Sequence, residues 1–373
     1  EPNKVWAGTR GGIYRSGDGG NSFGLAFGGV SVSGIATDTT GALIFAGTEE
    51  LGVLTGSDGQ GFRESNTGLN AARITAFDAM PGDLRVLFAA RTEKPGTQSL
   101  QMSADAGRVW TQLAPGKRFD RVRFLRALQA PQPLLLVIGE DGRWWKVSMS
   151  GQAEALAPPP GRLAAVEVAH GAGVVVCATD AGLFSVPAGG LPPARPAAAK
   201  GEPNGWYQLS AGSFGALAVG GDSYLALGPG LAARGSLSAP SADGRAEQFL
   251  PEGLSAGVIG ATLGPDPGGD AYAFTHDRIL VSLDRGATWS AVELPWPAKD
   301  LRAMAFDPGK PGRVVALDSY GVLLLGQERG RQWHALGNDP WLNPAQDFRM
   351  SAAAPNLALV ATLGHGLRVV SLH

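Results

Sequence analysis

The sequence has few of the residues that most often reveal a protein's chemistry. It contains one cysteine, Cys177, so no disulfide bond can form within the chain. Its five histidines are scattered and lack the short spacings of metal-binding motifs. We therefore expect neither a metal nor another cofactor.

Long runs of one charge and long apolar runs are also missing. Charged residues make up 17% of the chain and the net charge is −2. We expect no nucleic-acid partner, because such proteins cluster lysine and arginine to neutralise phosphates. No stretch approaches the roughly 20 apolar residues of a membrane-spanning helix, so we expect no membrane span. The densest basic segment, 117–126, alternates like the exposed face of a strand, with an anion-binding patch as the alternative.

Glycine and proline are plentiful by contrast, with 55 and 26 residues. Short apolar segments separated by turns occur in pairs, such as 174–179 and 182–185, and each pair predicts a β-hairpin. Nine such hairpins follow one another at intervals of about 44 residues, which is the length of a four-stranded propeller blade. The chain therefore contains one supersecondary unit repeated many times.

Each hairpin belongs to a larger unit of four strands, which we name A to D. Strands B and C form the hairpin, a strand A such as 303–307 precedes it, and a strand D such as 110–113 follows it. The first unit lacks strand A and the last ends at strand C. We expect an all-β fold, a single β-propeller of four-stranded antiparallel blades spanning residues 1–373. Nine hairpins favour nine blades, eight stay open, and seven fit less well.

One phrase, Ser-x-Asp-x-Gly-x-x-aromatic, recurs between strands C and D. Its three complete copies consist of Ser16, Asp18, Gly20 and Phe23; of Ser103, Asp105, Gly107 and Trp110; and of Ser282, Asp284, Gly286 and Trp289. Aspartate can accept hydrogen bonds from backbone N–H groups of its own turn, and glycine supplies the positive φ that the turn requires. The aromatic side chain can anchor the turn between neighbouring blades. We assign these residues a structural task.

This phrase resembles the Asp-box repeat, also called the bacterial neuraminidase repeat. The wider segment 5–20 resembles the sortilin and photosystem-assembly-factor branch of such propellers. The group includes sialidases, xyloglucan-cleaving hydrolases, sorting receptors and assembly factors. The resemblance implies a propeller fold and favours a secreted or periplasmic bacterial protein. The start at Glu1 without methionine agrees with a processed N-terminus or a trimmed one.

The enzymatic members of that group carry features that this sequence does not show. The early [Phe/Tyr]-Arg-Ile-Pro phrase of the sialidases is missing. A glycoside hydrolase needs two carboxylates across a cleft, and the sequence alone does not give their separation. We therefore expect a non-enzymatic binding or assembly propeller with a protein or peptide partner. The alternative, with a carbohydrate ligand, is a glycoside hydrolase or lyase of the Asp-box type.

By analogy with other propellers, the B–C turns and the D–A loops form the face that binds partners. Mixed charge together with tryptophan and tyrosine suits a protein partner. The candidates in B–C turns are Arg10, Glu49, Arg91, Glu140, Asp180, His276, Asp318, Tyr320 and His365. Those in D–A loops are Trp296 and Trp341. We assign no catalytic residue.

Two apolar segments carry expectations about burial. Cys177 lies within the apolar segment 174–178, so we expect a buried and unreactive thiol. Trp144 and Trp145 are adjacent strand residues whose side chains point to opposite faces. We therefore expect one of them to be buried and the other less so.

Overall fold

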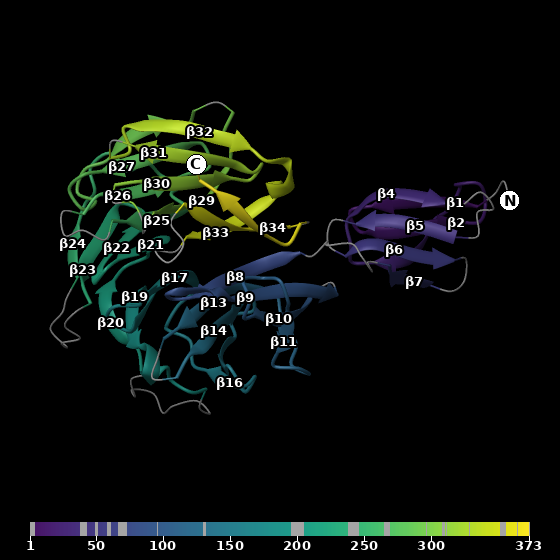
Figure 1. The fold of residues 1–373 in the computed structure, drawn as a ribbon, viewed down its shortest axis with the longest axis horizontal. Coiled ribbons are helices and arrows are strands. Elements are labelled where there is room, and N and C mark those ends of the chain that lie inside the picture. The colour runs from purple at the N-terminus through teal and green to yellow at the C-terminus, as the bar shows by residue number, and fades with distance from the viewer. Residues whose placement is uncertain are drawn as a thin grey trace.

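The structure is a computed structural model of the chain (Figure 1). It describes residues 4–37, 43–48, 51–57, 61–65, 73–94, 96–129, 132–194, 205–237, 246–264, 269–295, 297–307, 310, 312–327, 329–350, 356–363 and 365–372. The regular elements of this part of the chain are β-strands and two 3-10 helices, η1 (Ala188–Gly190) and η2 (Pro340–Leu342). Of the parts described, no helix is long and apolar enough to span a membrane.

The strands form nine antiparallel sheets, which we number 1 to 9 in chain order. Sheet 1 contains β1 (Val5–Thr9), β2 (Gly12–Ser16) and β3 (Gly24–Gly28), and sheet 2 contains β4 (Val32–Thr37), β5 (Leu43–Thr48), β6 (Gly52–Ser57) and β7 (Gly61–Glu64). Sheet 3 contains β8 (Ile74–Met80), β9 (Asp83–Lys94), β10 (Thr97–Ser103), β11 (Thr111–Leu113) and the short β12 (Phe119–Asp120).

The next three sheets have four strands each. Sheet 4 contains β13 (Val122–Leu128), β14 (Leu134–Gly139), β15 (Trp144–Ser148) and β16 (Ala153–Leu156). Sheet 5 contains β17 (Leu163–Ala169), β18 (Val174–Thr179), β19 (Gly182–Pro187) and β20 (Tyr207–Ala211). Sheet 6 contains β21 (Ala216–Gly220), β22 (Ser223–Gly228), β23 (Leu231–Ser236) and β24 (Glu247–Phe249).

The last three sheets complete the fold. Sheet 7 contains β25 (Gly260–Leu263), β26 (Ala271–Phe274), β27 (Arg278–Ser282) and β28 (Ser290–Glu293). Sheet 8 contains β29 (Leu301–Phe306), β30 (Val314–Asp318), β31 (Val322–Gln327) and β32 (Gln332–Asn338). Sheet 9 contains β33 (Ala345–Met350), β34 (Leu357–Thr362) and β35 (Leu367–Ser371).

Strand order within each sheet follows the chain, as the A-to-D unit predicts. The expected all-β fold of repeated four-stranded antiparallel units is confirmed, and the nine hairpins correspond to nine sheets. Sheet 1 has strands B, C and D, and sheet 9 has strands A, B and C. The two incomplete sheets are therefore those that the sequence marks as incomplete.

The apolar core lies between neighbouring sheets. Because strand side chains alternate between the two faces, strands B and C pack against the sheets on both sides. Trp144 lies in the cluster between sheets 4 and 5, and Trp145 packs against the cluster between sheets 3 and 4. Trp144 is buried and Trp145 is half-buried, so the expectation for this pair is confirmed. Cys177 is fully buried, as predicted.

The A strands of seven sheets contact one another in a cycle. Contacts join β8 to β13, β13 to β17, β17 to β21, β21 to β25, β25 to β29, β29 to β33, and β33 back to β8. A cavity of about 310 Å³, which we call the channel, is lined by residues from all seven of these strands. Figure 1 shows sheets 3 to 9 arranged around a common centre.

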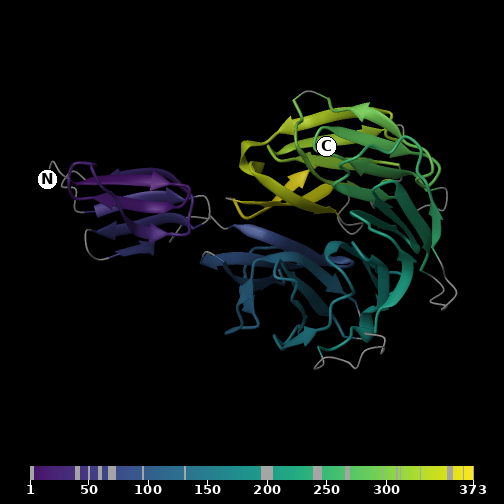
Figure 2. The same ribbon diagram turned by 180° about the vertical axis from the view of Figure 1, so that it is seen from behind.

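Sheets 1 and 2 lie outside this cycle. Their main contacts between sheets are with each other, β1 with β4 and β3 with β7. Figures 1 and 2 show the pair standing clear of the other seven sheets. The sequence predicted a ring of eight or nine blades and ranked seven lower, whereas the cycle of contacts contains seven sheets. The physical reason is that β33 and β34 of sheet 9 contact β8, the strand that sheet 2 would otherwise meet.

The Ser-x-Asp turns have the hydrogen bonds that their residue types predict. In the third copy, Ser282 Oγ donates to Asp284 Oδ1 at 2.8 Å, and the N–H of Gly286 donates to Ser282 Oγ at 2.8 Å. The N–H of Thr288 donates to Asp284 Oδ1 at 2.9 Å. Trp289 is 7% exposed between sheets 6 and 7, whereas Phe23 of sheet 1 is 45% exposed. Phe23 lacks the preceding sheet against which Trp289 packs.

Candidate functional site

The B–C turns and the segments that lead into the A strands meet on one face, which we call the turn face. In five sheets, a backbone N–H at the B–C turn donates to a carbonyl just before strand A. The pairs are Thr92 with Arg73, Glu140 with Arg121, Asp180 with Arg162, Ser319 with Asp300, and Leu363 with Pro344. These bonds hold the predicted partner-face segments together.

A β-bulge lies at the start of strand A in six sheets. The register shifts by one residue after the first pair, which leaves one residue without a partner on strand B. These residues are Ser33, Thr75, Arg123, Ala164, Arg302 and Gln346. Bulges re-aim side chains at the rims of barrels. Here they place Arg123 and Arg302 in the lining of the channel.

Arg123 is exposed, in agreement with the exposed strand face predicted for segment 117–126, and it also contacts the next sheet. Its guanidinium donates to the carbonyls of Leu163 and Ala164 at 2.9 and 3.2 Å. Burial and then the positive charge of Arg162 lower the pKa of Arg123. Arg123 and Arg162 also line a pocket of about 440 Å³ between sheets 4 and 5.

Further along the A strands, side chains of opposite charge lie close together on neighbouring strands. Arg349 Nε lies 3.5 Å from an oxygen of Asp78, and Arg349 Nη1 lies 2.7 Å from Asp347. Arg126 pairs with Glu167 at 3.1 Å. Burial lowers the pKa of Arg349, but the charges of Asp347, Asp78 and Glu167 outweigh burial and raise it. The sequence signal for this network is a charged residue at alternate positions of apolar strands.

A polar cluster joins the B–C turn of sheet 7 to the entry of sheet 8. His276 Nδ1 lies 2.5 Å from Asp300 Oδ1, and Arg302 Nη2 donates to Asp300 Oδ2 at 2.7 Å. Burial raises the pKa of Asp300, but hydrogen bonds from Ser319 and His276 and the charge of Arg302 outweigh it, so this pKa is lowered. His276 is exposed, as expected for a partner-face residue.

Three aromatic side chains lie on turns near this cluster, on sheets 8 and 9, and the turn that carries Tyr320 bonds the backbone of Asp300 through Ser319. Tyr320 is 51% exposed and Trp341 is 60% exposed. The rings of Trp341 and His365 meet edge to face at 5.2 Å. We call Tyr320, Trp341 and His365 the aromatic patch. All three were predicted from the sequence, and the structure places them on neighbouring turns.

The other predicted residues are more dispersed. Arg91, Glu140 and Asp180 are exposed on sheets 3, 4 and 5, and Arg10 is exposed on sheet 1, outside the cycle of sheets. Asp318 differs from expectation, because it is fully buried and accepts hydrogen bonds from three backbone N–H groups. Its role is structural. Glu49 and Trp296 lie outside the described residues.

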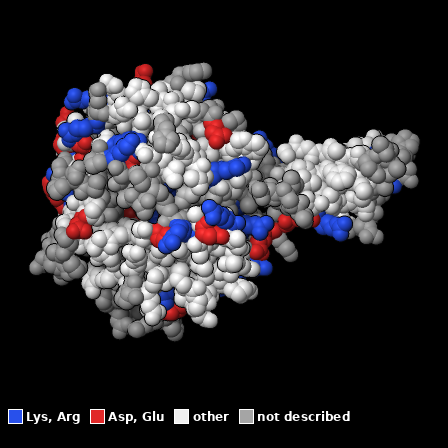
Figure 3. Space-filling model, viewed as in Figure 1, with Lys and Arg blue, Asp and Glu red and all other residues white. Residues whose placement is uncertain are grey.

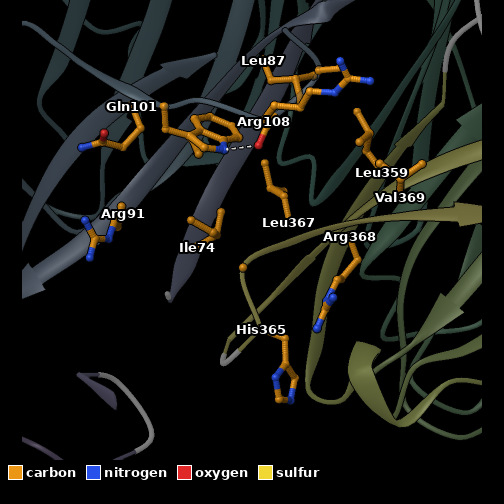
Figure 4. Close-up of a pocket in the computed structure, with 15 residues that line it drawn as sticks. Ile74, Leu87, Arg91, Gln101, Arg108, Leu359, His365, Leu367, Arg368 and Val369 are labelled. Atoms are coloured by element: carbon orange, nitrogen blue, oxygen red, sulfur yellow. Dashed lines mark hydrogen bonds between the residues drawn. The ribbon is translucent and has the colours of Figure 1, made fainter. Parts of the chain in front are cut away.

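A pocket of about 650 Å³ lies between sheets 3 and 9 (Figure 4). We call it the seam pocket. Its apolar lining includes Leu87, Trp110, Leu359, Leu367 and Val369. Figure 4 shows Arg91 on the sheet 3 side and Arg368 and His365 on the sheet 9 side. No sequence signal marked this pocket, because it depends on which sheets meet.

Carboxylates in these three pockets are few or paired. Of the lining residues that the structure describes, none in the seam pocket is Asp or Glu, and Glu140 is the one carboxylate in the pocket between sheets 4 and 5. In the channel, Glu167 and Asp347 each pair with an arginine. Among the residues that the structure describes, no group of three or more His, Cys, Asp or Glu could hold a metal ion. Figure 3 shows acidic and basic side chains interspersed on the visible surface.

Comparison with known proteins supports the fold and is silent on activity. The sequence matched no protein-family model and no curated protein. Many solved structures resemble the chain, and one is the crystal structure of a computationally designed protein, Ika8. It covers 92% of this chain and 96% of its own, with a TM-score of 0.53 and 13% identity. At this identity the likeness shows the fold alone.

Proposed function

We propose that sheets 3 to 9 form a seven-bladed propeller that acts as a non-enzymatic binding or assembly module. The cycle of A-strand contacts and the shared channel support the propeller. The Ser-x-Asp turns support kinship with the Asp-box repeats, in the style of the sortilin and assembly-factor branch. That kinship also favours a secreted or periplasmic location.

The observation that carries the binding role is the exposure of the aromatic patch. Among the described residues, five Phe, Tyr or Trp side chains are exposed, and Tyr320 and Trp341 are the two of these that lie in turn-face segments of the cycle; the others are Phe23, Phe45 and Tyr207. Exposed aromatic residues next to arginine are typical of the centres of protein interfaces. Arg302 and Asp300 supply charged groups at the entry of sheet 8, next to the turn that carries Tyr320. We therefore place the protein or peptide partner on the turn face of sheets 7 to 9.

Site-specific photo-crosslinking tests this role. A photoreactive amino acid replaces Tyr320, and a matched control carries it at Thr288, an exposed residue of a Ser-x-Asp turn. In an extract of the organism that makes the protein, we expect discrete adducts from position 320 and not from position 288. Trp341→Ala should abolish them. Equal adducts at both positions would contradict the proposal.

The alternative function is a carbohydrate-active hydrolase or lyase, and a polysaccharide activity screen addresses it. The proposal predicts no turnover. Turnover that disappears on replacing a single turn-face carboxylate such as Glu140, with Asp277→Asn as the matched control, would replace the binding role with an enzymatic one.

A further inference from the structure

Within the described residues, sheet 9 has no strand covering the outer edge of strand C, whereas the other sheets of the cycle have one. Its order is β33-β34-β35, so β35 has a partner on one side only. An uncovered edge strand presents unpaired backbone N–H and C=O groups, to which an extended segment can add. The seam pocket lies beside this edge, because Leu367, Arg368 and Val369 of β35 line it.

A comparison with sheet 7 shows what the missing strand would cover. Phe274 pairs with Ile279 next to the B–C turn of sheet 7, and Ala361 pairs with Leu367 at the same place in sheet 9. Two residues further on, Val281 and Val369 therefore correspond. Val281 is 8% exposed, whereas Val369 is 60% exposed. The apolar position that is buried in sheet 7 is therefore exposed to solvent in sheet 9.

The seam pocket lies at the junction between sheets 9 and 3. At other junctions between neighbouring sheets, residues of strand D fill the corresponding space. Val292 of β28 packs into the cluster that contains Trp333 of the following sheet, and Phe249 of β24 packs into the cluster that contains Trp289. The corresponding cluster between sheets 9 and 3 contains Trp110, and strand D contributes nothing to it. Since Val292 pairs with Ile279, an added strand would place an apolar side chain opposite Leu367.

The charged residues of the seam pocket indicate the charge of the segment that would add to β35. Arg91, Arg108 and Arg368 line it, and none of its described lining residues is acidic. The Nε atom of Arg368 is buried without a hydrogen-bond partner, and its guanidinium lies 5.3 Å from the ring of Trp341. The basic lining therefore favours an acidic segment.

The chain's own sheets show how such an arginine is satisfied. Lys146 of strand C faces Glu154 of strand D, with an ion pair of 2.9 Å. Arg234 of strand C faces Glu247 of strand D, also at 2.9 Å. A basic residue of strand C thus pairs directly with an acid on strand D. Arg368 is a strand C residue for which sheet 9 supplies no strand D.

We propose that an extended, acidic segment of the partner protein adds to β35 as the fourth strand of sheet 9. It lies antiparallel to β35, with an apolar side chain opposite Leu367 and a glutamate or aspartate opposite Arg368. This inference rests on the proposed binding role and names the segment that the partner presents. The aromatic patch adjoins the site, since His365 belongs to both.

A peptide based on β28 provides a defined probe. The probe is a fluorescent, end-capped peptide of residues 288–294 carrying Ala291→Glu, which by the sheet 7 register sets Glu opposite Arg368 and Val292 opposite Leu367. The control peptide carries Ala291→Lys. Fluorescence anisotropy with the full chain should show about tenfold tighter binding of the glutamate peptide, because a charge-assisted pair replaces a repulsive one.

Charge exchange in the protein gives the matched test. Arg368→Glu should reverse the preference between the two peptides, and Arg368→Gln should remove it, with circular dichroism verifying the fold. His276→Ala should leave peptide affinity unchanged while weakening the photo-crosslinks from position 320, because His276 belongs to the turn-face cluster and does not line the seam pocket. A failure of the seam proposal and a failure of the turn-face role are therefore distinguishable. No binding at about 1 mM protein, or a preference that ignores residue 368, overturns the proposal. A stable dimer that excludes the peptide would assign the edge to a second copy and also overturns it.

Discussion

The carboxylate of Asp318 accepts a hydrogen bond from the backbone N–H of Lys299 at 2.9 Å, which ties the B–C turn of sheet 8 to the segment entering that sheet. The other oxygen of Asp318 accepts from the N–H groups of Tyr320 and Val322. Asp318 therefore sets the backbone position of Tyr320, the first member of the aromatic patch.

Removing this carboxylate should destabilise the protein. Asp318→Ala leaves three backbone N–H groups in a buried place without their acceptor, and we expect a loss of about 3 kcal/mol in the free energy of unfolding. Asp180→Ala is the matched control, because exposed Asp180 accepts one such bond, from Arg162 at 2.7 Å. Denaturant titration should rank Asp318→Ala well below Asp180→Ala, and equal losses would contradict the assigned role.

Stability should fall in acid. Hydrogen bonds from Arg278 and then Thr275 lower the pKa of Asp277 to about 2, and hydrogen bonds from Arg85 lower that of Asp83 to about 2. Because these pKa values lie below the unfolded value of about 3.9, their stabilisation is present above pH 4 and is lost as pH falls towards 2.

Urea midpoints at pH 7, 4 and 2.5 measure this effect. The midpoint should change little down to pH 4 and then drop. Asp277→Asn should lower the midpoint at pH 7 and reduce the drop, since its carboxylate no longer titrates. A midpoint that rises between pH 4 and 2.5 would reverse the predicted sign.

The channel ion pairs should matter more than the surface ones. Arg349→Ala leaves Asp78 and Asp347 without their cation in a partly buried place, and we expect a loss of about 2 to 3 kcal/mol. Arg85→Ala breaks the exposed pair with Asp83 and should change the free energy of unfolding far less than Arg349→Ala does, because solvent screens an exposed pair. The free energies of unfolding of the two variants test this prediction. A larger loss for Arg85→Ala than for Arg349→Ala would contradict it.

Cys177 should resist thiol reagents. It is fully buried among apolar strands, and burial raises the pKa of its thiol well above the ordinary value. Since the thiolate is the reactive form, the native protein should not react with a disulfide reagent at pH 8. The denatured protein should react with one equivalent of the reagent. Rapid reaction of the native protein would show that sheet 5 opens readily.

Much of the local structure follows from sequence pattern. The apolar segment 174–179, the short turn and the segment from Gly182 predict a hairpin, and β18 and β19 occupy these residues. The pattern works because each strand B and C alternates between two buried faces. It does not reveal which sheets meet, because the residues that face a following sheet are apolar in sheet 2 and in sheet 9 alike.

The candidate site was predictable only in part. The aromatic patch was found because tyrosine and tryptophan in turns are conspicuous. Asp318 was misplaced, because a polar residue before a turn looks exposed until its three backbone partners are known. The seam pocket, which Arg368 lines, forms only because sheets 3 and 9 meet. The residues in contact there are almost 300 positions apart, so no local sequence pattern predicts the pocket.

The contact of sheet 9 with sheet 3 is the central claim, and a distance measurement tests it. Asp83 and Leu357 begin strand B in these two sheets, and cysteines at both, in a Cys177→Ala background, can carry spin labels. Pulsed electron resonance should give a separation of about one to two sheet spacings, roughly 10–20 Å. If sheets 1 and 2 stood between them in a nine-sheet ring, the separation would be roughly 30 Å or more, and that result would contradict the account.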